Sequence, residues 1–345
     1  MKRPYLIAEV GVNFYDTARV EGISPLEAAK KYVFEAKKAG ADAVKFQAYK
    51  ADKIVSKNSP AYWDLTKEPT PTQHGLFMKH DKFEPEDYRT LRNYCVEVGI
   101  DFTCTPFDLD AADFLDPMVD VFKISSSDLS NLPFLADIAK KQKPVLLSVG
   151  ASYISEIEEA VRVLTEAGCP DICLLHCVLS YPTKNEDANL NMIKTLKQVF
   201  PNHKIGYSDH TMPDKTMTIL TTAYLFGAEV IEKHFTLDKT LSGNDHYHAA
   251  DPEDLSLAVE NFKLLEVIGG QYEKTVLDCE ATPRKEARRS LVLARDMQEG
   301  EVIQQSDIMI KRPGTGIEPR HLEIVLGRKV TRDLKEDTVI TWEMV

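Results

Sequence analysis

The most constraining feature of this 345-residue sequence is an eightfold alternation of short apolar segments with longer amphipathic ones. Each short segment has the length and composition of a buried strand and ends in polar residues, and a helical pattern then follows. Such helical patterns cover residues 25–39, 84–98 and 154–167. Strand–helix alternation predicts a parallel α/β sheet, and eight units predict closure into a (β/α)8 TIM barrel. The strands are expected at residues 5–10, 43–47, 101–105, 121–125, 144–149, 171–178, 204–207 and 229–235.

A barrel takes about 250 residues, so part of the chain lies outside it. The alternation stops after Gly269 and Gly270, and residues 275–289 are polar and charged. Residues 292–303 (VLARDMQEGEVI) and 329–340 (KVTRDLKEDTVI) form a weak repeat, in which each half has the pattern of strand, turn and strand. We therefore expect a catalytic barrel over 1–272, a linker over 273–289 and a small, mostly β domain over 290–345.

One connection within the barrel is unusually long. The segment from Lys50 to Phe83 is rich in Pro, Thr, Lys and aromatic residues. Long ordered loops in barrels are commonly lids or partner surfaces, and we expect one of these roles here.

The charge balance limits the classes of partner. The net charge is −12, which argues against binding to nucleic acid or to anionic membranes. An anionic substrate would therefore need a local basic pocket. Glu9 and Asn13 interrupt the apolar N-terminal run, which does not fit a signal peptide, and no segment reaches the 18 apolar residues of a membrane span. The six cysteines match no zinc motif, so we expect buried reduced thiols in a cytoplasmic enzyme that acts on small molecules.

Polar side chains suited to chemistry lie at almost every predicted strand end, the position of the active site in a barrel. Taken singly, each has an ordinary interpretation, such as a solvated lysine or a capping serine. Lys45 and Lys123, however, lie inside strands (AVKFQ and VFKIS), where an unpaired ammonium group would cost several kcal/mol. Two such lysines facing one mouth predict a phosphate or carboxylate between them, with hydroxyl groups as further donors. The hydroxyls expected there belong to Ser126, Ser148 and Ser208.

Two histidines end neighbouring predicted strands, His210 and His234. Neutral imidazoles are good ligands for Mn, Fe, Co or Zn. Two protein ligands would leave open positions for water or substrate, as catalytic metal sites do. His246 and His248, in the loop NDHYHAAD, are alternative ligands, but a polar loop without a metal is an equally good interpretation.

The segments IAEVGVN, AVKFQ, TPF, KISSSD, LLSVGAS, LLHCVLSYPT, GYSDHT, IEKHFT and KRPGTGIEP, in this order, resemble the sialic acid synthase family over nearly the whole chain. The family condenses phosphoenolpyruvate with an N-acetylmannosamine-type sugar. The resemblance implies a TIM barrel followed by a domain similar to type III antifreeze protein (SAF). It further implies Mn²⁺ or Mg²⁺ as cofactor and a homodimer in which the C-terminal domains are exchanged.

The resemblance also assigns roles to individual residues. Glu9 is expected to handle protons beside the reacting carbon, and His210 and His234 to bind the metal. The residues expected to bind phosphoenolpyruvate are Lys45, Thr105, Lys123, Ser126, Ser148 and Ser208. Those expected to hold the sugar are Gln47, Tyr181, Asp245 and Arg312.

Two positions depart from the family's pattern. Leu179 stands where CTNIYP or CTSAYP places a polar residue that can touch phosphate, so one phosphate contact is in doubt. Asp128 stands for a longer Glu in KIGSGE, which bears on the fit of the sugar.

The reaction implied joins phosphoenolpyruvate to the open-chain aldehyde of N-acetylmannosamine and gives N-acetylneuraminate and phosphate. A legionaminate or pseudaminate synthase, acting on a 2,4-diacetamido-2,4,6-trideoxyhexose, is the alternative. A barrel that condenses phosphoenolpyruvate with an aldose phosphate would need a second basic cluster, and the sequence suggests none beyond Lys45 and Lys123. A non-enzymatic binding protein would not require these lysines and two histidines at strand ends.

Overall fold

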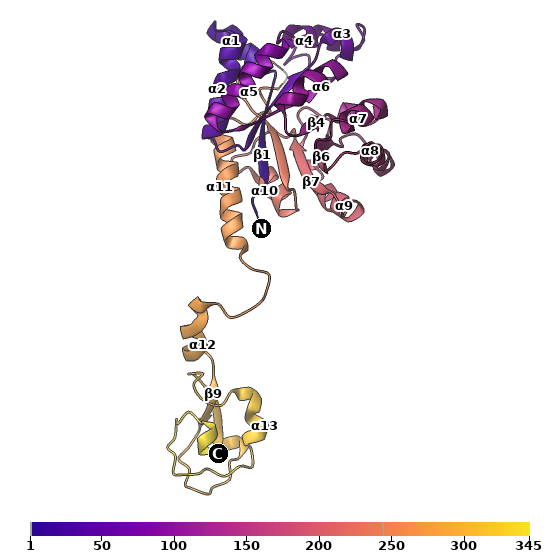
Figure 1. Ribbon diagram of the computed structural model, residues 1–345. Helices are drawn as coiled ribbons and strands as arrows, with labels where there is room; N and C mark the ends of the chain where they lie inside the picture. Colours follow the sequence, from indigo (N-terminus) through magenta and orange to yellow (C-terminus); the bar gives the residue numbers. More distant parts are fainter. Residues whose placement is uncertain (1, 244) are drawn as a thin grey trace. The chain divides into compact units, whose positions relative to one another are not determined.

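The computed structural model describes residues 2–243 and 245–345, which form two compact units (Figure 1). The first unit extends to Gly270, and the second spans Gln271–Val345. The second unit includes both the residues expected to form the linker and those expected to form the C-terminal domain. The expected boundaries at residues 272 and 290 therefore stay a prediction.

The strands of the first unit are β1 (Tyr5–Gly11), β2 (Ala43–Ala48), β3 (Asp101–Pro106), β4 (Phe122–Ile124), β5 (Val145–Ser148), β6 (Ile172–Cys177), β7 (Lys204–Asp209) and β8 (Val230–His234). They form one sheet in the order β3-β2-β1-β8-β7-β6-β5-β4, and the paired strands are parallel. β4 returns to the side of β3, where the Thr103 hydroxyl donates to the Val121 carbonyl oxygen at 3.4 Å. The sheet is thus a nearly closed barrel, which confirms the predicted fold, and each strand overlaps its expected segment.

Helices surround the sheet (Figure 1). Local sequence explains where they begin: Ser24 and Asp251 cap helices that have Pro at the first position and an acidic third residue. The apolar stripe of α8 is buried at Ile157, Ala160 and Leu164, as a 3.6-residue period requires. The helices of the barrel are α1 (Phe14–Glu21), α2 (Pro25–Lys38), α5 (Pro85–Val98), α6 (Leu109–Leu115), α7 (Leu132–Ala139), α8 (Ile154–Glu166), α9 (Asn191–Val199), α10 (Thr218–Leu225) and α11 (Pro252–Gly269).

The long connection after β2 is ordered and carries the helices α3 (Ala51–Ile54) and α4 (Gln73–His80). The Lys50 ammonium group donates to the carbonyl oxygens of Asp81 and Phe83, at 3.1 and 3.2 Å, and so ties the two ends of the connection together. Within it, Trp63 is buried and its indole N–H donates to the Glu68 carbonyl oxygen at 3.0 Å.

The second unit has a small apolar core that includes Leu291, Ile317 and Ile340. Its elements are α12 (Ala281–Ala287), β9 (Ser290–Leu293), β10 (Ile308–Lys311) and α13 (Leu322–Val325), and β9 and β10 form an antiparallel pair. Each half of the repeat was expected as strand, turn and strand, and among the described residues the two strands of a half do not pair with each other. The two halves instead run antiparallel to each other through isolated bridges such as Val292 with Val339 and Val302 with Lys329. Each half buries its apolar residues against the other half, so neither needs a hairpin of its own.

Helices of the described residues are all too short or too polar to cross a lipid bilayer.

Candidate active site

A cavity of about 510 Å³ opens at the carboxyl ends of the barrel strands, within the first unit. Every strand or the residues just after it supply part of its wall, as barrel architecture predicts. The wall residues from the eight strands, in chain order, are Glu9, Lys45, Thr105, Lys123, Ser148, Cys177, Ser208 and His234. The structure therefore brings the predicted strand-end residues into one pocket, and Ser126, Gln47, Tyr181, Asp245 and His210 line it as well.

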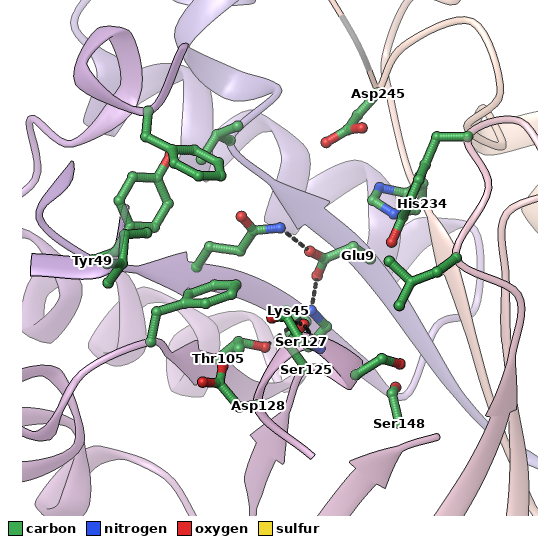
Figure 2. Close-up of a pocket in the computed structure, with 18 of the residues that line it drawn as sticks. Glu9, Lys45, Tyr49, Thr105, Ser125, Ser127, Asp128, Ser148, His234 and Asp245 are labelled. Carbon is green, nitrogen blue, oxygen red and sulfur yellow. Dashed lines mark hydrogen bonds and ion pairs between the residues drawn. The ribbon is translucent and has the colours of Figure 1, made fainter. Parts of the chain in front are cut away.

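The floor of the pocket is a buried cluster of two ammonium and two carboxylate groups. Lys45 Nζ lies 2.6 Å from Glu9 Oε2 and 3.2 Å from Thr105 Oγ1 (Figure 2). Glu232 stands between the two lysines, with its Oε1 atom 3.9 Å from Lys45 Nζ and 3.8 Å from Lys123 Nζ. Sequence reasoning missed Glu232. Strand alternation could have found it, because Glu232 precedes His234 by two residues and so faces the same side.

Burial shapes the titration of this cluster. It raises the pKa of Glu9 above its usual value, although the neighbouring Lys45 acts against this. It also lowers the pKa of Lys123, which Glu232 only partly opposes. For Glu232 itself, burial is outweighed by Lys123 and Lys45, and its pKa lies below the usual value. The expectation of two unpaired lysines is therefore wrong, because Lys45 is paired with Glu9 and Glu232 lies 3.8 Å from Lys123. Lys123, whose carboxylate neighbour is the more distant, is the better placed of the two for an added anion.

Several buried polar atoms of the pocket have no hydrogen-bond partner among the described residues. They include Ser148 Oγ, Glu232 Oε2 and His234 Nδ1. Since an unsatisfied buried polar atom costs about 1–3 kcal/mol, such atoms indicate a place for a ligand. Ser208 differs, because its hydroxyl donates to Glu232 at 3.0 Å, and the hydroxyl oxygen of Ser126 accepts from the Gly150 N–H at 2.9 Å.

The histidines His210 and His234 lie on neighbouring strand ends, with ring centroids 5.3 Å apart. His210 Nδ1 lies 2.9 Å from the Val178 carbonyl oxygen, which leaves Nε2 as the nitrogen able to bind a metal. Burial lowers the pKa of His210 to about 4. Burial and the neighbouring His248 and His210 rings hold the pKa of His234 far below its usual value. Both imidazoles are therefore neutral near pH 7, the form that binds metals.

A second arrangement around His234 also fits a metal. One ligand atom each from His234, Asp245 and His248 lie within 4.8 Å of one another. These residues, with the unpartnered Nδ1 of His234, make the site chemically suited to a divalent cation.

A buried ion pair on the outer face of β7 and β8 supports this region. Asp209 and Lys233 are register partners on the two strands, and Lys233 Nζ lies 2.7 Å from Asp209 Oδ2. Burial alone would raise the pKa of Asp209, but Lys233 and hydrogen bonds from Thr211 and Tyr207 hold it below the usual value. His210 follows Asp209 in the sequence and His234 follows Lys233. The ion pair therefore helps to hold the two histidines at the same level along the neighbouring strands.

The residues expected to bind the sugar fall into two groups. Gln47 donates to Glu9 Oε1 at 2.8 Å, and Tyr181 packs against the His210 ring with centroids 4.2 Å apart. Asp245 lies on the same side of the pocket as His234 (Figure 2). Arg312 is exposed and belongs to the second unit, so its expected role stays a prediction. Both departures from the family pattern, Leu179 and Asp128, line the pocket.

An aromatic wall closes the other side of the pocket. Tyr49 packs edge-on against Phe77 and Phe107, with centroids 5.3 and 5.8 Å apart. Figure 2 shows Tyr49 across the pocket from His234 and Asp245, with Glu9 between them. Leu76 and Phe77, from the long connection after β2, line the pocket, while the expected role of the connection as a lid or partner surface stays a prediction.

Comparisons with known proteins bear on the family and the fold of both parts of the chain. Residues 32–274 match the NeuB family, and residues 288–345 match the SAF domain. An uncharacterised protein of Methanocaldococcus jannaschii is 44% identical over 98% of this chain and 94% of its own. The N,N'-diacetyllegionaminic acid synthase of Legionella pneumophila is 35% identical over 99% of this chain and 94% of its own. The solved N-acetylneuraminic acid (sialic acid) synthetase of Leptospira borgpetersenii, in complex with citrate, is 33% identical with a TM-score of 0.70, over 81% of this chain and 90% of its own.

Proposed function

This chain belongs to the NeuB family, and we propose that it condenses phosphoenolpyruvate with the open-chain aldehyde of an N-acetylated aminohexose. The products are a nine-carbon 2-keto acid and inorganic phosphate. The observation that carries the proposal is the pair of buried lysines, Lys45 and Lys123, which face one pocket beside the unpartnered hydroxyl of Ser148. This set of donors suits a bound phosphate in a site of low polarity.

Phosphoenolpyruvate would lie on the floor of the pocket. Lys45 and Lys123 would bind its anionic groups by charge-assisted hydrogen bonds, with hydroxyl donors around them. The hydroxyl groups assigned to this role are those of Thr105, Ser126, Ser148 and Ser208. Glu232 lies between the lysines and would compete with the substrate for their ammonium groups. Its negative charge therefore limits how much negative charge the substrate can bring to the floor.

The reaction forms a carbon–carbon bond and a bond between C2 and the oxygen of water, and it breaks the bond between C2 and the phosphate oxygen. The methylene carbon of phosphoenolpyruvate attacks the aldehyde carbon, whose oxygen gains a proton. Water adds to C2 and loses one proton. The hydroxyl group left on C2 loses its proton to the departing phosphate, and this gives the keto group. Glu9, which is buried and contacts Lys45 and Gln47, would carry a proton between water and the new hydroxyl group. The floor holds both substrates in one orientation, which lowers the entropic part of the barrier.

A divalent cation, Mn²⁺ or Mg²⁺, would be held by His210 and His234. When bound, such a cation acts as a Lewis acid toward the aldehyde oxygen. If this assignment is correct, EDTA abolishes turnover without unfolding the barrel, and added Mn²⁺ or Mg²⁺ restores it. Full activity in a metal-stripped sample would contradict it.

N-acetylmannosamine is the sugar that the sequence predicts, with Gln47, Tyr181, Asp245 and Arg312 as its contacts. The aromatic wall favours a second candidate, a 2,4-diacetamido-2,4,6-trideoxyhexose. Its C6 methyl and second acetamido group offer apolar surface to Tyr49, Phe77 and Phe107, whereas free hydroxyl groups there would lose water without gaining partners. The Legionella relative is named for the acid made from such a sugar.

A phosphate-release assay with both sugars tests the proposal. We expect phosphate release to depend on an N-acetylated hexosamine, and the two kcat/KM values to differ by about ten-fold or more, the size of effect that apolar contacts give. A sugar phosphate is disfavoured, because Lys53 is a single further lysine of the wall and not the second basic cluster that a sugar phosphate would need. If no phosphate is released when either sugar is present, the proposed function is contradicted.

The C-terminal unit would complete the site as part of a domain-exchanged homodimer. The proposal follows the family's organisation, with a barrel over 1–272, a linker over 273–289 and a SAF domain over 290–345. A domain of this size is marginal alone, so docking onto a barrel would stabilise it. The use of phosphoenolpyruvate, a metabolite of the cell interior, supports a cytoplasmic location.

A further inference from the structure

We propose that His248 is a metal ligand, and that His234, Asp245 and His248 together give this enzyme a tighter and more transition-metal-selective site than two histidines would. The inference rests on the proposed function, in which a divalent cation acts in the same pocket. It changes one assignment made there, because Asp245 becomes a metal ligand instead of a contact of the sugar. It replaces the interpretation of His248 as a polar loop residue.

The backbone of the loop after β8 brings His248 to His234. The Ala250 N–H donates to the His234 carbonyl oxygen at 2.7 Å, and Ala250 pairs with Phe235 as a parallel bridge. This pairing fixes the loop alongside the end of the strand. The His248 and His234 rings consequently lie with centroids 5.0 Å apart, closer than the His210 and His234 rings.

The composition of the group fits a metal. Ligand atoms around one cation, each about 2.0–2.2 Å from it, are roughly 3.0–4.4 Å apart. The ligand atoms of the three residues lie within 4.8 Å of one another, and His248 Nε2 is 4.0 Å from Asp245 Oδ1. Small side-chain movements would therefore close the group around an ion. Because His234 and Asp245 line the pocket and His248 is fully buried, the open coordination positions would face the substrate.

A neighbouring histidine shows what a structural residue looks like in the same loop. His246 is also fully buried, but its Nδ1 lies 2.8 Å from Thr236 Oγ1 and its Nε2 lies 3.5 Å from Asp16 Oδ2. The Nδ1 atom of His246 thus has a hydrogen-bond partner, and its Nε2 atom faces the Asp16 carboxylate. His246 is a matched control for His248.

The ligand set predicts which metals bind. Two imidazoles and one carboxylate are the set that Mn²⁺, Fe²⁺, Co²⁺ and Zn²⁺ accept, whereas Mg²⁺ prefers oxygen ligands and keeps several waters. The carboxylate also adds a negative charge that the pair His210 and His234 lacks. We therefore expect Mn²⁺ to bind the full-length protein at least ten-fold more tightly than Mg²⁺.

The experiment measures Mn²⁺ affinity of the metal-stripped full-length protein by electron paramagnetic resonance, for the wild type, His248→Gln and His246→Gln. We expect His248→Gln to weaken binding ten-fold or more and His246→Gln to change it less than about three-fold, since loss even of outer partners of ligands costs 10–100-fold. Thermal unfolding without metal checks that each variant is folded. His248→Asn takes the place of His248→Gln if the latter does not fold.

The outcomes separate the two proposals. Equal Mn²⁺ affinity of the wild type and His248→Gln, or equal loss in both variants, overturns the role of His248, whatever the activity. A wild type that binds no Mn²⁺ overturns it too. Mn²⁺ binding that requires His248, in a protein that releases no phosphate with any hexosamine, supports the ligand assignment and contradicts the proposed function.

Discussion

The barrel and the C-terminal unit differ in how many ionisable side chains they bury. The barrel buries a whole set of ionisable groups, including Glu9, Lys45, Lys123 and Glu232 at the pocket and Lys233 behind it. In the described part of the C-terminal unit, Asp307 is the buried ionisable side chain, and the core is otherwise aliphatic. A fold that only needs stability keeps charges at the surface, because burying them is costly. The comparison indicates that the barrel's buried charges serve binding and chemistry.

The largest effect should come from breaking a buried ion pair in the barrel. Lys233→Met leaves the Asp209 carboxylate buried without its ammonium partner, and we expect a loss of about 3–5 kcal/mol in the free energy of unfolding. The matched change in the C-terminal unit is Lys335→Met, which removes an exposed pair with Asp296 at 2.7 Å. It should change the free energy of unfolding far less, because solvent screens an exposed pair. Denaturant unfolding of both variants checks this, and equal losses would remove the contrast between the units.

A smaller effect is expected at the floor of the pocket. Lys123→Ala removes a charge-assisted hydrogen bond worth about 1.5–3 kcal/mol, so KM for phosphoenolpyruvate should rise roughly ten-fold or more. KM for the sugar should change much less. Steady-state kinetics with each substrate varied in turn measures both, with Lys335→Ala as a surface control. An unchanged KM for phosphoenolpyruvate would place the phosphate elsewhere.

Arg312 tests whether the C-terminal unit takes part in the chemistry at all. Its guanidinium group offers a planar fork of donors that suits the oxygens of a sugar. Arg312→Ala should raise KM for the sugar by more than about ten-fold, since it removes charge-assisted hydrogen bonds, and leave KM for phosphoenolpyruvate nearly unchanged. No change in either constant would confine the active site to the barrel.

The proposed exchange of domains predicts that Arg312→Ala and Lys123→Ala subunits complement each other. At low substrate concentration, Arg312→Ala and Lys123→Ala should each be nearly inactive. Subunits mixed and allowed to exchange should form dimers with one intact site, and recover up to about a quarter of wild-type activity by random pairing. Heterodimers that stay inactive would mean that Arg312 acts on its own barrel or not at all.

The smallest expected effect is a difference in acid sensitivity. Burial lowers the pKa of His176 in the barrel, so the folded protein keeps this ring neutral while the unfolded chain binds a proton below about pH 6.5. Its contribution to stability is complete above that pH and is lost as pH falls toward the lower folded pKa. In the C-terminal unit, Arg295 holds the pKa of Asp307 below its usual value, which matters only in stronger acid.

Hydrogen exchange at pH 7.5 and 5.5 can follow the two units separately. Protection should fall more in the barrel than in the C-terminal unit, and His176→Gln, which keeps a donor for the Ala188 carbonyl oxygen, should reduce the difference. If protection from exchange falls equally in both units, buried histidines are not the cause of the acid sensitivity.

The sequence predicted the parts of the molecule that follow from periodicity. Strand–helix alternation located all eight strands, and the rule that barrel sites lie at strand ends brought Lys45, Lys123 and the serines to one pocket. Glu232 was missed although alternation along β8 places it on the same face as His234, because site residues were expected only at the ends of the strands.

The rest depends on contacts between distant segments. His248 lies beside His234 because Ala250 bonds to the strand end, and sequence spacing does not encode that bond. The aromatic wall joins Phe77 to Tyr49 and Phe107 across a long connection. In the C-terminal unit the repeat was visible, but its pairing was not, because two similar halves can each form a hairpin or pair with each other.

The central claim is that the barrel pocket joins the methylene carbon of phosphoenolpyruvate to a sugar aldehyde. Its most direct test is mass spectrometry of the products formed from phosphoenolpyruvate labelled with ¹³C at C3 and each of the two candidate sugars. We predict a labelled nine-carbon 2-keto acid in equal amount to the phosphate released, and loss of both products in Lys123→Ala at low phosphoenolpyruvate. Phosphate accompanied by labelled pyruvate, with no label in a sugar acid, would contradict the account.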